Sequence, residues 1–134
     1  MRAVPPVRWV ASATVVAVLA YAAVAVAVDR PVAVHDYLLS CAGCHKLDGS
    51  GSAHVPSLRA IDRLLVYDGG RDYVLRVPGV AQAPLSDARL AAMLNWVFAN
   101  FGSGAPTPRF SAAEVGNARS APFDDPKAAR AALH

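Results

Sequence analysis

The sequence predicts an all-α fold, and three features support this prediction. Apolar residues recur at helical spacing from Val34 to Cys41 and again from Leu90 to Phe101. The run from Leu90 to Phe101 has typical helix boundaries: Ser86 can cap its first turn, and Gly102 follows its last turn. No strand–helix–strand pattern is visible along the chain. We therefore expect a small helical domain.

The expected elements before Ser86 are short. The first helix should run from about Val32 to Cys44, with Pro31 in its first turn, where a missing N–H costs little. A short helix is expected over residues 57–66, and Gly69-Gly70 then interrupts the chain. Residues 71–76 predict one more helical turn, which ends there because the residue before a proline, here Val77, is pushed out of the α region.

The chain changes character after Gly102. Residues 104–108 have the composition of a linker, and Ser111 with Glu114 forms a capping-box pattern at the start of a short helix. A further helix should begin near Asp125-Pro126 and end near Leu133. We expect this C-terminal extension, residues 104–134, to pack on the preceding domain (residues 29–103), with binding to a partner protein as the alternative.

The N-terminal segment has the pattern of an export signal. Met1 to Arg8 contains two arginines and no acid, and residues 9–28 carry no charge and are rich in alanine and valine. Ala25-Val26-Ala27 offers a cleavage site, but the apolar run is long enough to span a bilayer. We favour a cleaved signal over residues 1–28, with an uncleaved anchor to the inner membrane as the alternative. Either outcome places the remainder in the periplasm.

The central motif is Cys41-Ala42-Gly43-Cys44-His45, a C-x-x-C-H sequence, which is the attachment signature of c-type haem. Two thiols three positions apart can each bond to one vinyl group of the same porphyrin. The histidine that follows the second cysteine is then placed to bind the iron. This motif predicts one covalent haem c per chain, held by Cys41 and Cys44, with His45 as the proximal iron ligand.

Three other functions also use a pair of cysteines. A dithiol redox pair needs a thioredoxin-like βαβ setting, which the sequence does not indicate. A zinc site needs further ligands, and the chain has two cysteines in all. A structural disulfide is compatible with export. Neither the dithiol nor the disulfide requires the adjacent His45, so haem attachment is favoured.

The order of these motifs over about residues 32–102 resembles the class I monohaem c-type cytochromes of bacteria. The resemblance rests on the C-x-x-C-H motif, the glycine-rich stretch after it, Val55-Pro56 and the helix that carries Trp96. It implies that the first and last helices of the domain cross, with Trp96 near the crossing. It also implies that the backbone carbonyl of Pro56 accepts a hydrogen bond from the proximal histidine.

Two further expectations concern the surroundings of the haem. Arg71 and Tyr73 are candidates to contact a haem propionate, because a planar guanidinium suits a carboxylate. Class I cytochromes place a methionine iron ligand in the loop before the last helix, but residues 77–84 contain none. Met93 lies inside that helix, so we expect it to pack in the core and keep it as a tentative ligand. The sixth iron ligand is thus left open.

These features predict a protein that is not an enzyme. We expect an electron carrier between an exported dehydrogenase or reductase and the respiratory chain, with an open-site haem protein that binds a small gas or peroxide as the alternative. The formal net charge is +3, and no run of basic residues suggests nucleic acid. Contact with a membrane is expected only through residues 9–28, and only if the export signal is not cleaved.

Overall fold

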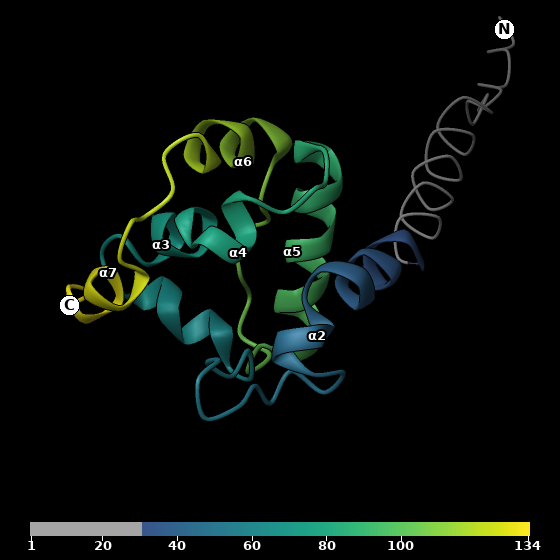
Figure 1. Cartoon of the computed structure of the whole chain (residues 1–134), viewed down its shortest axis with the longest axis horizontal. Helices are drawn as coiled ribbons and strands as arrows, with labels where there is room; N and C mark the ends of the chain where they lie inside the picture. Colours follow the sequence, from purple (N-terminus) through teal and green to yellow (C-terminus); the bar gives the residue numbers. More distant parts are fainter. Residues whose placement is uncertain (1–30) are drawn as a thin grey trace, which may run out of the picture.

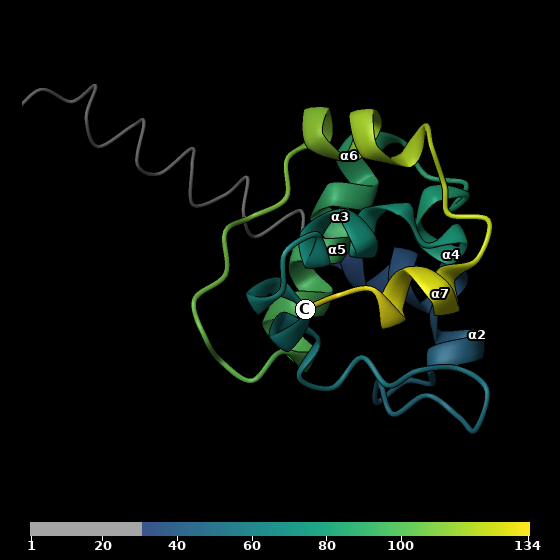
Figure 2. The ribbon, with the colours of Figure 1, turned by 90° about the vertical axis from the view of Figure 1, so that its left-hand side faces the viewer.

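The computed structural model describes residues 31–134, and the expected export segment lies outside the described residues. Within the described part, helices and loops form the whole fold and no strand is present, which confirms the all-α prediction. Figure 1 shows the helices arranged around one centre, and Figure 2 shows the same ribbon from the side. No helix among residues 31–134 is long and apolar enough to cross a membrane.

The first described helix covers residues 31–40, and after a turn at Cys41 the chain continues in α2 (Ala42–His45). The later helices follow in chain order: η1, a 3₁₀ helix (Ile61–Val66), α3 (Gly70–Arg76), α4 (Pro78–Ala81), α5 (Asp87–Phe101), α6 (Ala112–Arg119) and α7 (Pro126–Ala131). The expected caps are present. The Ser86 side chain accepts a hydrogen bond from the backbone of Arg89, and Ser111 and Glu114 form the capping box of α6.

Two expected elements differ from the structure. The helix expected from residue 57 begins at Ile61 and is a 3₁₀ helix. Ala60, whose N–H donates to the Phe101 carbonyl, adopts a left-handed conformation with a φ of 57°, so a helix cannot continue through it and begins after it. The stretch over 77–84 was expected to be a loop, yet it contains α4, which begins at Pro78 because proline suits a first helical turn.

The core is built around α5. Its buried side chains include Leu90, Met93, Leu94 and Val97, and Leu90 has no exposed surface at all. Helix α6 packs against α5 and α3, and it contributes the fully buried Val115. Because α5 contacts elements on several sides, it positions both the N-terminal helices and the C-terminal extension.

The first helix and α5 are joined by an aromatic cluster and by an ion pair. The Tyr37 ring lies 5.2 Å from Trp96 and 5.3 Å from Phe101, measured between ring centroids. Asp36, which is 1 % exposed, is bound by the guanidinium of Arg89, with Nε at 3.0 Å from Oδ2. The packing of Trp96 against the first helix agrees with the contact that the resemblance implied.

Candidate functional site

The C-x-x-C-H residues lie where the first helix turns into α2. Cys41 is at the turn and is half-buried, whereas Cys44 and His45 lie on α2, with Cys44 exposed. Both thiols are free. The two cysteines therefore present unpaired thiols from one short stretch of backbone, beside the ring of His45.

The His45 ring is held by the backbone carbonyl of Pro56. Its Nδ1 lies 3.0 Å from the Pro56 oxygen. Because a carbonyl oxygen can only accept, Nδ1 donates the hydrogen, and in the neutral ring Nε2 keeps its lone pair. A histidine whose one nitrogen is fixed by a carbonyl presents the other nitrogen as a metal ligand in a defined orientation.

The loop that carries Pro56 is folded tightly under α2. The Tyr37 hydroxyl donates to the Lys46 carbonyl at 2.6 Å, and the Gly51 N–H donates to the His45 carbonyl at 3.1 Å. Gly51 has a φ of +70°, and a Cβ there would lie 2.4 Å from the Val55 carbonyl oxygen. Glycine is required at this position, and the turn delivers Pro56 to the ring.

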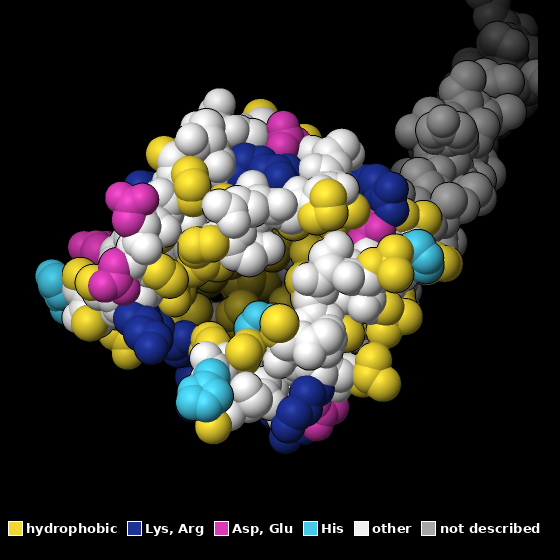
Figure 3. All heavy atoms as spheres, in the orientation of Figure 1, with side chains coloured by type: hydrophobic (Ala, Val, Ile, Leu, Met, Phe, Trp, Pro, Cys, Tyr) yellow, Lys and Arg dark blue, Asp and Glu magenta, His cyan; other side chains and the backbone are white. Residues whose placement is uncertain are grey.

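The space next to these residues is hollowed and apolar. Figure 3 shows a hollow in this face of the molecule, with hydrophobic side chains over its visible wall and one histidine side chain inside it. By comparison with Figure 1, the hollow lies between α2 on one side and α3, α4 and α7 on the others. Several apolar side chains of these segments and of η1 pack on the core yet stay partly exposed: Leu58, Ile61, Leu64, Leu65, Val77 and Val80.

The Cys41 thiol differs from the reactive thiol of a dithiol oxidoreductase. Burial raises the pKa of Cys41 to about 11, and the neighbouring Cys44 contributes a smaller part of this increase. The reactive cysteine of a redox pair has a lowered pKa, so that it is a thiolate at neutral pH. Within residues 31–134, no group of three or more His, Cys, Asp or Glu side chains could hold a metal ion by itself. Haem differs in needing few protein ligands, since the porphyrin supplies four nitrogens.

Met93 lies on the α5 side of the motif. It is 1 % exposed, and its Sδ lies 3.9 Å from the Cys41 Sγ. This position, inside the core and against Cys41, is that of a packing residue. Its alternative role as an iron ligand stays a prediction.

Arg71 has a different role from the one expected. Its guanidinium binds the Glu114 carboxylate and donates to the carbonyl oxygens of Pro108 and Arg109, both at 2.9 Å. It also stacks on Phe110, with its Cζ 4.0 Å from the ring centroid. These bonds use four of the five N–H donors of the guanidinium, so Arg71 holds the C-terminal extension. Its contact with a propionate stays a prediction.

Tyr73 keeps a hydroxyl that could serve a ligand. The residue is 7 % exposed, and its ring stacks on Phe123 at 6.1 Å. No hydrogen bond among residues 31–134 uses its hydroxyl, and no unpartnered side-chain oxygen there is fully buried. The hydroxyl is therefore reachable from outside the core. Its contact with a propionate stays a prediction.

Arg119 and Asn95 are two side chains that position this region, and no sequence pattern predicts their role. Arg119 on α6 donates to the carbonyl oxygens of Ala81, Ala83 and Leu85 at 2.9, 2.6 and 2.8 Å. The Asn95 side chain on α5 pairs with both backbone groups of Phe110. Their partners lie 15 to 38 positions away, and no local pattern links them.

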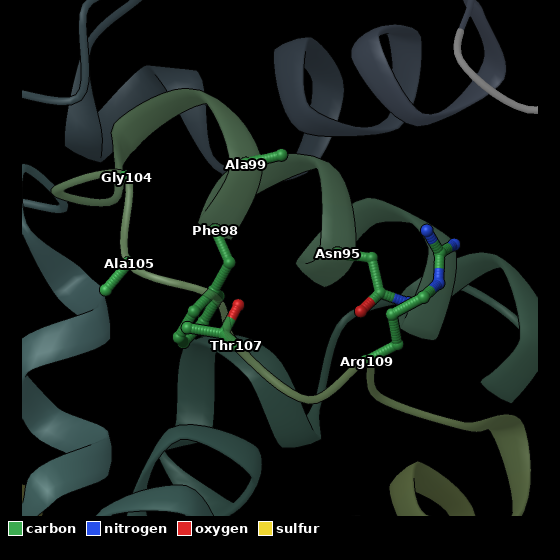
Figure 4. A pocket seen from close by; sticks show the side chains of 7 residues that line it. All are labelled: Asn95, Phe98, Ala99, Gly104, Ala105, Thr107 and Arg109. Atoms are coloured by element: carbon green, nitrogen blue, oxygen red, sulfur yellow. The ribbon is translucent and has the colours of Figure 1, made fainter.

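Two depressions lie outside the motif. One of about 290 Å³ is bounded by α5 and the linker after it, as Figure 4 shows, and the amide of Asn95 in its lining is already bonded to Phe110. The other, of about 370 Å³, is bounded by Leu39 and Ser40, directly before Cys41, and by residues of α4 and the loop after it. Neither contains a cluster of reactive side chains. His54, in the loop before Pro56, is exposed.

Comparisons with protein-family models, with curated proteins and with solved structures find no match to this chain.

Proposed function

We propose that this protein is an exported c-type cytochrome that holds one covalent haem and carries single electrons. The observation that carries the proposal is the contact of 3.0 Å between His45 Nδ1 and the Pro56 carbonyl, beside two free thiols and an apolar hollow. The donor set fits the group. Two thiols, one imidazole with a free Nε2 and apolar walls are what a c-type haem needs from its protein.

Each residue has a defined part in this proposal. The thiols of Cys41 and Cys44 each add across one vinyl group, so that a C–S bond forms and the hydrogen goes to the neighbouring carbon, with no external oxidant. His45 supplies the proximal nitrogen, and Pro56 fixes its orientation. The bound haem would supply reversible one-electron oxidation of its iron.

The surface near the motif fits a transient redox partner. Cys44 is exposed, and the nearby Leu39 and Leu47 are 74 % and 73 % exposed. A small apolar rim around a cofactor edge suits short-lived contacts of the size that electron-transfer complexes use. An exported dehydrogenase or reductase is the proposed partner, and the periplasm the proposed compartment.

The test is covalent haem content. After export in a host that attaches c-type haem, the haem should stay with the polypeptide on acid–acetone extraction, and the mass should rise by one haem. Cys41→Ala or Cys44→Ala should leave at most one thioether. His45→Ala should lose the native iron ligation, whereas the matched variant His54→Ala, in the exposed loop, should keep it. Release of all haem by the extraction would contradict the proposal.

A second candidate function is the binding of a small gas at an open iron. It is favoured by the position of Met93, buried against Cys41, and by the lack of a methionine among residues 77–84. Spectra of the reduced protein with and without carbon monoxide distinguish the two candidates. A carrier with two strong axial ligands leaves no room for the gas, and an open site binds it readily.

A further inference from the structure

The segment where the resemblance expects an iron ligand is fixed in place by the C-terminal extension. Besides its three carbonyl contacts, Arg119 pairs with Asp87 at the start of α5, at 3.2 Å. Residues 77–86 contain no methionine, histidine, lysine, tyrosine or cysteine. Since these side chains are the ones that bind haem iron, this segment has no group to offer, and the clamp of Arg119 limits its movement.

The extension continues from α6 along α3. The backbone N–H of Phe123 donates to the Arg76 carbonyl at 2.9 Å, and Arg76 Nε donates to the Ala121 carbonyl at 2.6 Å. The Arg76 guanidinium also lies 4.1 Å from the Phe123 ring centroid. Together with the stacking of Phe123 on Tyr73, these contacts fix the path of the chain into α7.

Helix α7 then lies across the hollow from α2. Figures 1 and 3 show α2 on one side of the hollow and α7 on the other. Phe123, Ala129 and Leu133 pack on the core and remain partly exposed, and a Cβ on Gly69 would lie 3.7 Å from the Leu133 side chain. Hydrocarbon side chains cannot bind iron, but they can exclude water from the space beside it.

We propose that residues 121–133 form an apolar cover on the side of the haem site opposite His45. This inference rests on the covalent haem of the proposed function and deepens its second candidate, the binding of a small gas at an open iron. The apolar side chains of this cover, Phe123, Ala129 and Leu133, carry no iron-binding atom, and Lys127 of the same segment is exposed. Such a cover would leave the iron open to a small neutral molecule, such as carbon monoxide or nitric oxide. Arg76 is a positioning residue in this arrangement, because it acts through Phe123 and the backbone of the extension.

The test uses the haem-loaded protein and measures carbon monoxide recombination after a light flash. The reduced protein should bind the gas. Phe123→Ala and Leu133→Ala should each speed its entry severalfold, because they open the cover, and Phe123→Leu should lie between them and the unchanged protein. Val32→Ala is the control, since Val32 is an exposed apolar residue at the start of the first helix, away from α7, and it should leave the rate unchanged.

Three outcomes would overturn the inference. The first is an iron that does not bind the gas because a side chain of the protein occupies its sixth position. Lys127→Ala and His134→Ala would then show whether that side chain comes from the extension. The second is gas binding at rates that Phe123→Ala, Leu133→Ala and Phe123→Leu leave unchanged. The third is equal amide hydrogen exchange of residues 121–133 in the haem-loaded protein and in the haem-free double variant Cys41→Ala, Cys44→Ala. Absence of covalent haem, measured by mass, would instead contradict the proposed function.

Discussion

The sulfur atoms of Cys41 and Met93 lie 3.9 Å apart although the two residues are 52 positions apart in the chain. This contact joins the turn before α2 to the middle of α5. Met93 is 1 % exposed, so its side chain is enclosed by the core around it. The relationship makes the α5 core a support for the attachment motif.

Replacing Met93 with leucine tests whether this residue packs or binds iron. Leucine has nearly the same volume, so Met93→Leu should lower the free energy of unfolding by less than about 1.5 kcal/mol. The absorption spectrum of the oxidised haem protein should not change. If the oxidised protein has the long-wavelength band of a sulfur-ligated haem and Met93→Leu abolishes it, Met93 is the sixth ligand.

Arg89→Ala should destabilise the protein because it leaves the buried carboxylate of Asp36 without its guanidinium partner. The loss, measured by denaturant unfolding, should exceed that of an exposed pair because Asp36 is buried, although the Arg89 side chain is itself 50 % exposed. Arg59→Ala is the matched control: its partner Asp48 is 56 % exposed, so removal of that pair should cost less. Equal losses for the two variants would contradict the importance assigned to the buried carboxylate of Asp36.

Gly49→Ala should be costly at the loop beside the motif. Gly49 has a φ of +69°, and an added Cβ would lie 2.9 Å from the Phe101 ring. The left-handed conformation alone costs about 1–2 kcal/mol for an alanine, and the contact adds to it. Gly79→Ala, on α4 with no atom within 4 Å of the new Cβ, should be neutral or stabilising by up to about 1 kcal/mol. Thermal unfolding of both variants measures this difference in stability.

The docking of α6 should weaken in acid. The hydrogen bond from Arg71 holds the pKa of Glu114 below its ordinary value of 4.5. Because the pKa of Glu114 is lower in the folded state than in the unfolded state, the pair stabilises the fold fully at a pH above the unfolded-state pKa. This stabilisation is lost as the pH falls through the folded-state pKa. Glu114→Gln should be less stable at neutral pH and should lose part of the acid dependence of unfolding. An unchanged acid profile in that variant would contradict this role.

The N-terminal segment is tested by the mass of the mature protein. A chain that starts near Val28 would mean that residues 1–28 are a removed export signal. An intact Met1, together with recovery in the membrane fraction, would mean that residues 9–28 are kept as an anchor. We expect removal, because Ala25-Val26-Ala27 has the small residues of a cleavage site.

Local sequence determined the ends of several helices and the composition of the site. Ser86, the pair Ser111 and Glu114, and Asp125 each cap a helix through atoms within three residues, so their effect is visible in the sequence. The same holds for the attachment motif, whose members are adjacent. The contact between His45 and Pro56 was expected through the resemblance, and the glycine-rich turn between them is short enough to form it.

Tertiary structure decided what local pattern could not. The stretch before Ile61 is not helical, because Ala60, whose N–H bonds to the carbonyl of Phe101 at the end of α5, adopts a left-handed conformation. Arg71 binds Glu114, 43 positions away, where the sequence suggested a propionate. Arg119 and Arg76 hold the extension in place by binding backbone carbonyls. Every residue has a backbone carbonyl, so the sequence does not indicate which ones an arginine will bind. A guanidinium can satisfy its donors with any nearby oxygen, so its partner is chosen by which oxygens the packed helices bring within reach.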